Sequence, residues 1–394
     1  MTMRSVARVC AASLLAAGAL TLTATPALAA DVDFGVDIKG TTVALGSDGK
    51  PAIITVSNNG ASKPSEVKIK FDVSKVKLGG KAIVDLGGDG DEDCALDAQG
   101  RADCVLDESI IPAPGGSVDL PVFIGKVEPG STGKAGEMTV SIEVEGDSNS
   151  KNDSDTVDVT LSENKGVDLV VVAEDVTLND GDRFTGEPIP AGGKSVTEAF
   201  VTNFGDQTAA GLKVVGTLPK GATFVDQEAP GCDFSADQRS VRCEVEAGVL
   251  SLPPLTAAAV RFDIVVAKDV KGPVSLQDGS WTFVAGAAVD PASARIAARQ
   301  ALPDYVFQVD PAEITHMDAD PSDNVDGFAV LVAGPAGGSG GGGTGGDDDP
   351  GLPVTGPVAG SIAGAGGAVL IAGAVMFMVS RRRRVVLVTP GDGK

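Results

Sequence analysis

The chain has 394 residues and an acidic composition, with 31 Lys and Arg against 54 Asp and Glu and a formal net charge of -23. So much negative charge argues against binding nucleic acid or anionic lipid through a basic face. Hydrophobic residues make up 43% of the chain and aromatic residues only 4%, which is enough for two cores of ordinary size but not for large aromatic binding platforms.

Residues 1–29 have the features of a secretory signal peptide. Two arginines precede an apolar region at residues 9–22, and Ala27 and Ala29 place small side chains where a signal peptidase reads them. We predict cleavage after Ala29, with Ala30 as the alternative. The rest of the chain is then expected outside the cell.

One design occurs twice between residues 31 and 333. The segment VSNNG at 56–60 returns as VTNFG at 201–205, and each copy closes with a polar Asp/Asn stretch before a last apolar strand. Apolar and polar residues alternate with period two in segments such as 67–73 and 260–266, which indicates strands with one buried face. We therefore predict an all-β chain of two tandem immunoglobulin-like β-sandwiches, at 31–165 and 166–333.

The second sandwich is the longer, and its extra length falls at about 267–317. Asp290 and Pro291 suit the start of a helix, which we expect at residues 292–302. This segment is interpreted as an insert that either contributes to recognition or only elaborates the fold. Trp281 and Tyr305 fall within it, and a lone Trp is more often a core residue than a ligand platform.

Four cysteines remain once Cys10 leaves with the signal peptide. An even number in an exported chain indicates disulfides. The spacings of ten and eleven residues favour local pairs over the two crossed connectivities, and a zinc site is the competing interpretation. The predicted pairs are Cys94 with Cys104 and Cys232 with Cys243.

Acidic residues crowd around Cys94 and form the best candidate metal site. Oxygen ligands at alternate positions suit a hard cation such as calcium, although the segment lacks the glycine and bidentate Glu of an EF-hand loop. The alternative is a solvated acidic hairpin. The candidate ligands are Asp89, Asp91, Asp93 and Asp97, and a looser second group is Asp318, Asp320, Asp323 and Asp326.

Catalytic chemistry has little support in the sequence. His316 is the only histidine and lies in a polar, acidic turn, so a Ser-His-Asp or Cys-His arrangement would depend on it alone. No phosphate-binding or dinucleotide motif lies between a strand and a helix. Nothing singles out a Lys, Asn and acid trio for an intramolecular isopeptide link. We therefore expect no enzyme and, beyond the candidate calcium, no cofactor.

The C-terminal end has three parts in a fixed order after a Gly- and Asp-rich linker at 334–351. The pentapeptide Leu352, Pro353, Val354, Thr355 and Gly356 comes first. An apolar run at 358–379 follows, which as a helix would span about 33 Å and could cross a bilayer. Four arginines at 381–384 then favour a cytoplasmic end.

These three parts, over 352–394, resemble the LPXTG cell-wall sorting signal of Gram-positive surface proteins. The resemblance implies that a sortase cleaves between Thr355 and Gly356 and links Thr355 to peptidoglycan. The C-terminal helix would then hold the chain in the membrane only transiently. A simple membrane anchor with an accidental pentapeptide is the alternative.

The second sandwich resembles the bacterial surface repeat DUF11, an immunoglobulin-like module. The resemblance rests on VTNFG at 201–205, LPKGATFV at 218–225 and the following cysteines Cys232 and Cys243. The first copy has VSK at 73–75 in place of the Leu-Pro-x-Gly segment and is closer to a CARDB-type relative. The resemblance implies a stalk or display module without catalytic residues.

The sequence as a whole predicts a secreted protein anchored covalently to the wall of a Gram-positive bacterium. Its sandwiches would serve adhesion or binding of an extracellular ligand whose identity the sequence does not give. The alternative is a structural wall protein or spacer that binds nothing specific. The expected partners are the sortase and peptidoglycan.

Overall fold

The computed structural model describes residues 32–86, 94–179, 184–225, 229–247, 249–288, 305–308 and 318–334. The predicted signal peptide, the linker from residue 335 and the sorting signal at 352–394 lie outside these residues, and so does the helix expected at 292–302. None of the helices in the described part has the length and apolarity needed to cross a bilayer.

The first sandwich is formed by two sheets with strand orders β1-β3-β7-β5 and β2-β9-β8-β4-β6. Neighbouring strands are antiparallel except for the short β2, which pairs with β9 in parallel. Its elements are β1 (Phe34–Lys39), β2 (Thr42–Val43), β3 (Gly49–Asn58), β4 (Lys68–Asp72), α1 (Ser74–Gly79), β5 (Ala82–Asp85), β6 (Arg101–Val105), β7 (Ser117–Lys126), β8 (Gly133–Glu143) and β9 (Ser154–Leu161).

The second sandwich repeats this plan in sheets of order β10-β11-β17-β13 and β14-β15-β12-β18-β20, with β19 on β17 and β16 on β12. The order β15-β12-β18-β20 matches β6-β4-β8-β9 of the first sandwich, so the duplication extends to the topology. Its elements are β10 (Leu169–Ala173), β11 (Lys194–Asn203), β12 (Ala209–Thr217), β13 (Ala222–Phe224), β14 (Cys232–Phe234), β15 (Ser240–Val245), β16 (Ser251–Leu252), β17 (Ala257–Val266), β18 (Val274–Ala288), β19 (Val306–Gln308), η2 (Pro321–Asp323) and β20 (Val325–Val332).

The interpretation of 267–317 as an insert is wrong for its first part. Strand β18 lies between β12 and β20 and pairs with both along most of its length. Trp281 on this strand is fully buried, and its Nε1 donates a hydrogen bond to Thr197 Oγ1 at 3.1 Å. The strand therefore belongs to the core of the second sandwich.

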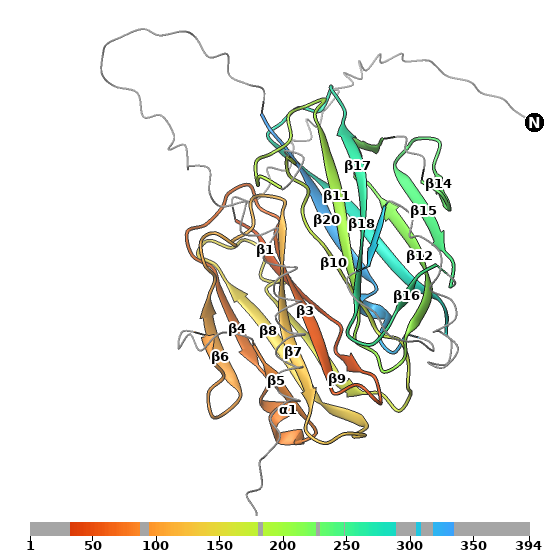
Figure 1. Cartoon of the computed structure of the whole chain (residues 1–394). Helices are drawn as coiled ribbons and strands as arrows, with labels where there is room; N and C mark the ends of the chain where they lie inside the picture. The colour runs from red at the N-terminus through yellow and green to blue at the C-terminus, as the bar shows by residue number, and fades with distance from the viewer. Residues whose placement is uncertain are drawn as a thin grey trace, which may run out of the picture.

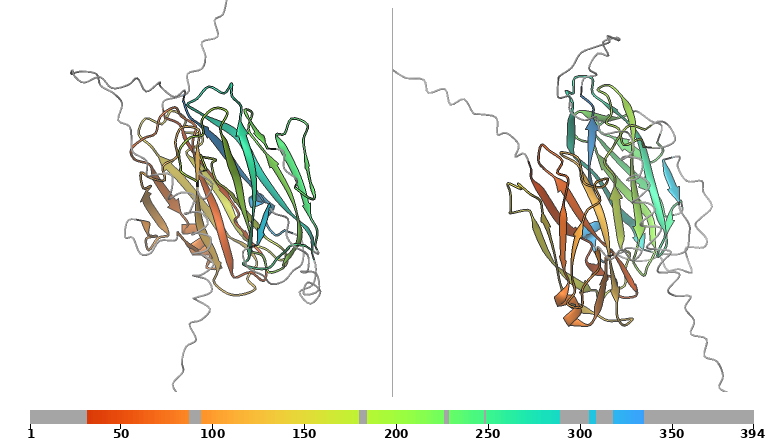
Figure 2. Two further views of the ribbon diagram at one scale, coloured as in Figure 1. Left: turned by 45° about the horizontal axis from the view of Figure 1, so that its top comes forward. Right: turned by 90° about the vertical axis from the view of Figure 1, so that its left-hand side faces the viewer.

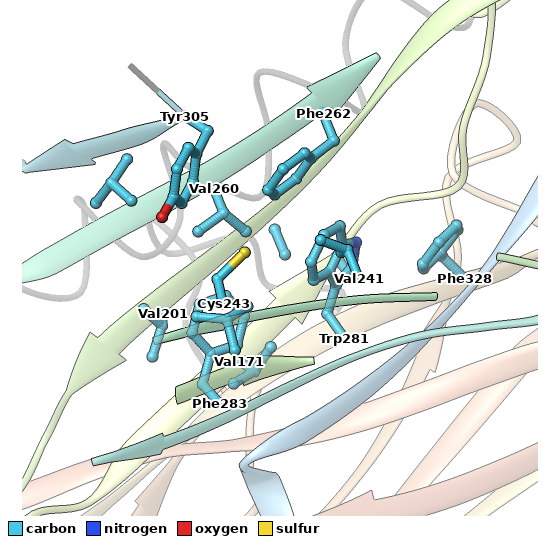
Figure 3. Packing of buried hydrophobic residues seen from close by; sticks show 14 of the residues in the cluster. Val171, Val201, Val241, Cys243, Val260, Phe262, Trp281, Phe283, Tyr305 and Phe328 are labelled. Atoms are coloured by element: carbon cyan, nitrogen blue, oxygen red, sulfur yellow. The ribbon is translucent and has the colours of Figure 1, made fainter. Parts of the chain in front are cut away.

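Aromatic rings fill the space between the two sheets of the second sandwich (Figure 3). The ring of Phe262 stacks on Trp281 with centroids 5.7 Å apart, and Tyr305 lies 5.3 Å from Phe262 on the other side. The Tyr305 hydroxyl donates to the carbonyl of Pro230 at 2.7 Å, which satisfies its one polar group. Trp281 and Tyr305 therefore stabilise the core and form no exposed ligand platform.

The two sandwiches lie side by side and contact each other through their outer faces (Figures 1 and 2). Leu169 and Val171 of β10 point into their own core, whereas Val170 and Val172 point outward and pack with Phe204 and with Ile53 of β3. This contact buries β10 on both faces, which explains its continuous apolar sequence. The all-β fold class predicted from the sequence is confirmed, and the sandwiches share an extensive interface.

Candidate functional site

A lysine of the first sandwich is buried among three carboxylates of the second. Lys50, near the start of β3, has no solvent exposure. Its Nζ lies 2.5 Å from Asp168 Oδ1, 2.7 Å from Asp323 Oδ2 and 3.7 Å from Asp320 Oδ2. Asp168 precedes β10, and the other two acids flank or belong to the short helix η2. We call these four residues the Lys50 cluster.

The cluster accounts for two acids that we grouped as looser calcium candidates. Asp320 and Asp323 contact the ammonium group of Lys50, which supplies the positive charge that a metal ion would supply. The other two, Asp318 and Asp326, accept hydrogen bonds from the backbone of Leu169 and Ala173. Among the described residues, no group of three metal-ligating side chains is placed to hold an ion.

The charges in the Lys50 cluster depend on its burial. Burial alone would lower the pKa of Lys50, but the surrounding carboxylates outweigh it and raise that pKa above its ordinary value. Burial raises the pKa of Asp168 and of Asp323, against the opposing pull of Lys50. For Asp320, Lys50 and nearby hydrogen-bond donors outweigh burial and lower the pKa. Asp320 is thus the stable counter-ion, and the other two acids hold protons more readily.

The first sandwich shows what this site looks like without the lysine. Asp147 accepts from the backbone N–H of Phe34 at 2.7 Å, as Asp318 accepts from Leu169 at 3.1 Å. Each of these acids also accepts from the residue two positions further along its own loop. These shared bonds align the two loops residue by residue. In this alignment Asn149 corresponds to Asp320, Asn152 corresponds to Asp323 and Asp33 corresponds to Asp168.

Two amides therefore stand in the first sandwich where two acids stand in the second. Asn152 Nδ2 donates to Asp33 Oδ1 at 2.9 Å, so these two side chains pair within one domain. In the second sandwich Asp168 corresponds to Asp33, and Asp323 corresponds to Asn152. Both acids contact Lys50 from the neighbouring domain. The second sandwich thus has acids at two positions where the first has amides, and these acids contact a lysine of the other domain. The cluster is therefore a specific contact between the domains.

A second acidic group lies at the same interface. Asp119 of β7 accepts from Thr55 Oγ1 at 2.7 Å, and its carboxyl group is also hydrogen-bonded to that of Asp326 on β20. A hydrogen bond between two carboxyl groups requires a shared proton, and burial raises the pKa of both. Burial, followed by neighbouring acids, also raises the pKa of Glu174 to about 8. Protonation of these acids therefore reduces the repulsion between carboxyl groups at this interface.

Backbone groups complete the contact between the sandwiches. Asp206 accepts from the N–H of Gly46 at 2.7 Å and from Gly166 at 2.8 Å, which fixes the connection between the domains. Asp175 accepts from the N–H of Ser117 at 3.1 Å, and Ser275 Oγ donates to the carbonyl of Gly115 at 2.6 Å. These contacts lie at several places along the interface, so the domains are coupled as one unit.

Each sandwich contains one disulfide. Cys94 bonds to Cys104 at the edge strand β6, and Cys232 bonds to Cys243 between β14 and β15. Of the first calcium group, Asp89, Asp91 and Asp93 lie outside the described residues. The carboxylate of Asp97 accepts from the N–H groups of Gln99 and Arg101, both at 2.8 Å, so it organises a turn.

A hollow lies at one edge of the first sandwich. It lies between the segment before β4 and the end of β8, and five carboxylates line it. Lys68 also lines it and pairs with Glu66 at 3.0 Å, so the excess negative charge comes from the other four acids and suits a cationic group on a ligand. The acids are Glu66, Glu143, Glu145, Asp147 and Asp153.

Comparisons with known proteins do not assign the chain to a family. No model of a protein family matches it, and no curated protein matches it. Among solved structures, alpha-2-macroglobulin of Escherichia coli activated by porcine elastase is 15% identical with a TM-score of 0.22 over 77% of this chain and 22% of that one. The partial N-terminal region of an enterococcal surface protein is 8% identical with a TM-score of 0.23 over 77% and 95%.

The chain spans about a fifth of the length of the first of these structures. At TM-scores this low, neither likeness carries an argument about fold or function. The DUF11 and sorting-signal resemblances therefore rest on the sequence motifs alone.

Proposed function

We propose that this protein is secreted, attached covalently to peptidoglycan and displayed at the surface of a Gram-positive bacterium. The order of the three C-terminal parts carries the proposal: a sortase pentapeptide, an apolar run of bilayer length and four arginines. The signal-peptide features at the other end of the chain support it. The two disulfides also support it, because such bonds persist in oxidising, extracellular surroundings.

In this proposal the protein is the substrate of a sortase and has no catalytic role of its own. The acyl group of Thr355 passes to an amine of the peptidoglycan precursor, and the piece from Gly356 onward is released. The apolar run at 358–379 holds the chain in the membrane until that step. Replacing Thr355 with Ala keeps the backbone carbonyl but removes the threonine side chain that the motif specifies.

The test is cell fractionation of the full-length chain with Thr355→Ala. The variant is expected in the membrane or the medium, whereas the unchanged chain is expected in the wall fraction. Val354→Ala is the matched control, because it alters the variable position of the pentapeptide and should leave wall attachment unchanged. Wall attachment of the Thr355 variant at the level of the unchanged chain would rule out sorting.

Between the two roles considered for the displayed part, tight coupling favours a stiff structural spacer. The buried Lys50 cluster and the apolar contact around Ile53 and Phe204 hold the two sandwiches against each other. Adhesion is the second candidate, and the acidic pocket near β4 is the observation that favours it.

A binding screen of the secreted protein separates these two roles. It would use host proteins, glycans and wall polymers, with and without calcium. Saturable binding that Glu145→Gln weakens, while an exposed acid outside the pocket such as Glu108→Gln does not, would establish the pocket as an adhesive site. Absence of binding under both conditions would favour the spacer.

A further inference from the structure

We propose that Lys50 and Asp168 form an amide bond, so that the two sandwiches are joined covalently within one chain. This cross-link is separate from the attachment of Thr355 to the wall and does not depend on it. It would add a modification site at the interface between the domains. Contacts in the Lys50 cluster, and the contrast with the first sandwich, support it.

The reacting groups are already in contact. Lys50 Nζ lies 2.5 Å from Asp168 Oδ1, and the carboxyl carbon that it would attack is one bond beyond that oxygen. Both residues have no solvent exposure, so water does not compete with the amine for the carboxyl group. Two groups held at contact distance react as parts of one molecule, which removes much of the entropic barrier.

Asp323 is placed to move the protons. Its Oδ2 lies 2.7 Å from Lys50 Nζ, and among the described residues no other donor is bonded to either of its oxygens. Asp168 Oδ2 likewise accepts no hydrogen bond there, so it is available as the oxygen that leaves. Burial raises the pKa of Asp323 and so makes it a stronger base, whereas the surrounding carboxylates raise the pKa of Lys50. The proton transfer is therefore unfavourable by itself and is drawn forward by the attack on Asp168.

The reaction is a condensation that needs no other reactant. Asp323 accepts a proton from the ammonium group and leaves a neutral amine on Lys50. The amine nitrogen attacks the carboxyl carbon of protonated Asp168 and forms the new C–N bond. Asp323 donates its proton to the departing hydroxyl group as the C–O bond breaks, and the second amine proton restores the proton on Asp323. The products are one secondary amide, a protonated Asp323 and one water molecule.

The charge balance of the site favours the amide. One ammonium group faces three carboxyl groups in a dry interface, and buried ion pairs recover their desolvation cost poorly. The reaction removes the ammonium charge of Lys50 and leaves Asp323 protonated, so the buried site loses one positive and one negative charge.

The test is peptide mapping of the full-length chain after reduction and denaturation. Trypsin leaves 40–68 and 166–183 as single peptides, because proline follows Lys50 and Lys63. The expected product is one branched peptide that joins them, lighter than their sum by one water molecule, with the branch at Lys50 and Asp168. Recovery of the two peptides only as separate linear species, or a branch at Asp323, would overturn the proposal.

A variant of Asp323, which accepts and donates protons in the proposed reaction, tests the chemistry separately. Asp323→Asn keeps both reacting groups, and it is expected to fold because Asn152 occupies the corresponding place in the first sandwich. Its peptides should be recovered unlinked while Trp281 fluorescence stays native. Lys126→Met is the control, since Lys126 Nζ donates to the backbone carbonyls of Ala44 and Leu45 and its neighbouring carboxylates are Asp206 and Asp48. Its loss should leave the link intact. A fully linked Asp323→Asn protein would contradict the role of Asp323.

Discussion

Asn58 and Asn203 occupy the same place in the two sandwiches and make the same hydrogen bonds. Each is the last residue of its strand and is buried, with exposed fractions of 1% and 0%. Each Oδ1 accepts from the N–H of the glycine two residues on, at 3.0 and 2.9 Å. Each Nδ2 donates to the carbonyl four residues on and to a distant carbonyl, Pro112 or Leu252. The repeated motif is therefore a structural clamp at the strand end.

Replacing Asn203 with Ala should destabilise the second sandwich by about 2–4 kcal/mol, because buried backbone groups lose their partner. Asp168, whose N–H donates to Asn203 Oδ1 at 3.1 Å, would lose one of them. Urea unfolding measures the effect. Asn59→Ala is the control, since the side chain of Asn59 is exposed in the adjacent position of the first copy. Equal stability of the two variants would show that the clamp is unimportant.

The acidic interface predicts a stability that falls as pH rises. Burial raises the pKa of Glu174 to about 8 and that of Asp175 to about 6. The folded chain then binds more protons than the unfolded chain between these values and about pH 4, where such groups titrate when unfolded. The stabilisation is complete below that pH and is lost as pH rises through the folded-state values. The melting temperature is expected to be lower at about pH 8.5 than at about pH 5.

Glu174→Gln tests the cause of this pH dependence. Glutamine keeps the size of the side chain but cannot ionise, so the variant should lose less stability than the unchanged chain on going to about pH 8.5. Glu66→Gln on the exposed surface is the control and should keep the full dependence. An unchanged pH profile in the Glu174 variant would assign the effect to other groups.

Close packing of a glycine against Trp281 gives a third prediction. A Cβ added at Gly216 would lie 2.4 Å from the Trp281 ring, whereas one added at Gly327 would have no neighbour closer than 3.7 Å. Gly216→Ala should therefore destabilise the fold by about 1–3 kcal/mol through overpacking, and Gly327→Ala should not. Thermal unfolding of both variants measures the difference. Similar melting temperatures would show that the Trp281 ring can move aside.

The repeated segments and the period-two alternation were sufficient to predict the all-β class. The alternation failed in β18, where Leu276 and Gly279 flank a shift in register and Asp278 has a φ of 74°. An irregularity of this kind interrupts the regular alternation of side chains. The strand therefore looked like part of an insert, although Trp281 on it is a core residue.

The Lys50 cluster could not be predicted from the sequence by local patterns. Lys50 and Asp168 are 118 residues apart and belong to different domains, and only the packing of the sandwiches brings them together. The available signal was the difference between Asn152 and Asp323 in the closing loops of the two copies. That difference becomes informative only after the shared hydrogen bonds have aligned the loops.

We propose above that a sortase attaches the displayed sandwiches to the wall through Thr355. The most direct test is mass spectrometry of the protein released from purified walls by a peptidoglycan hydrolase. We expect a C-terminal peptide that ends at Thr355 and carries a peptidoglycan fragment. A wall-associated protein whose C-terminal peptides continue through Gly356 into the arginine-rich tail would contradict it.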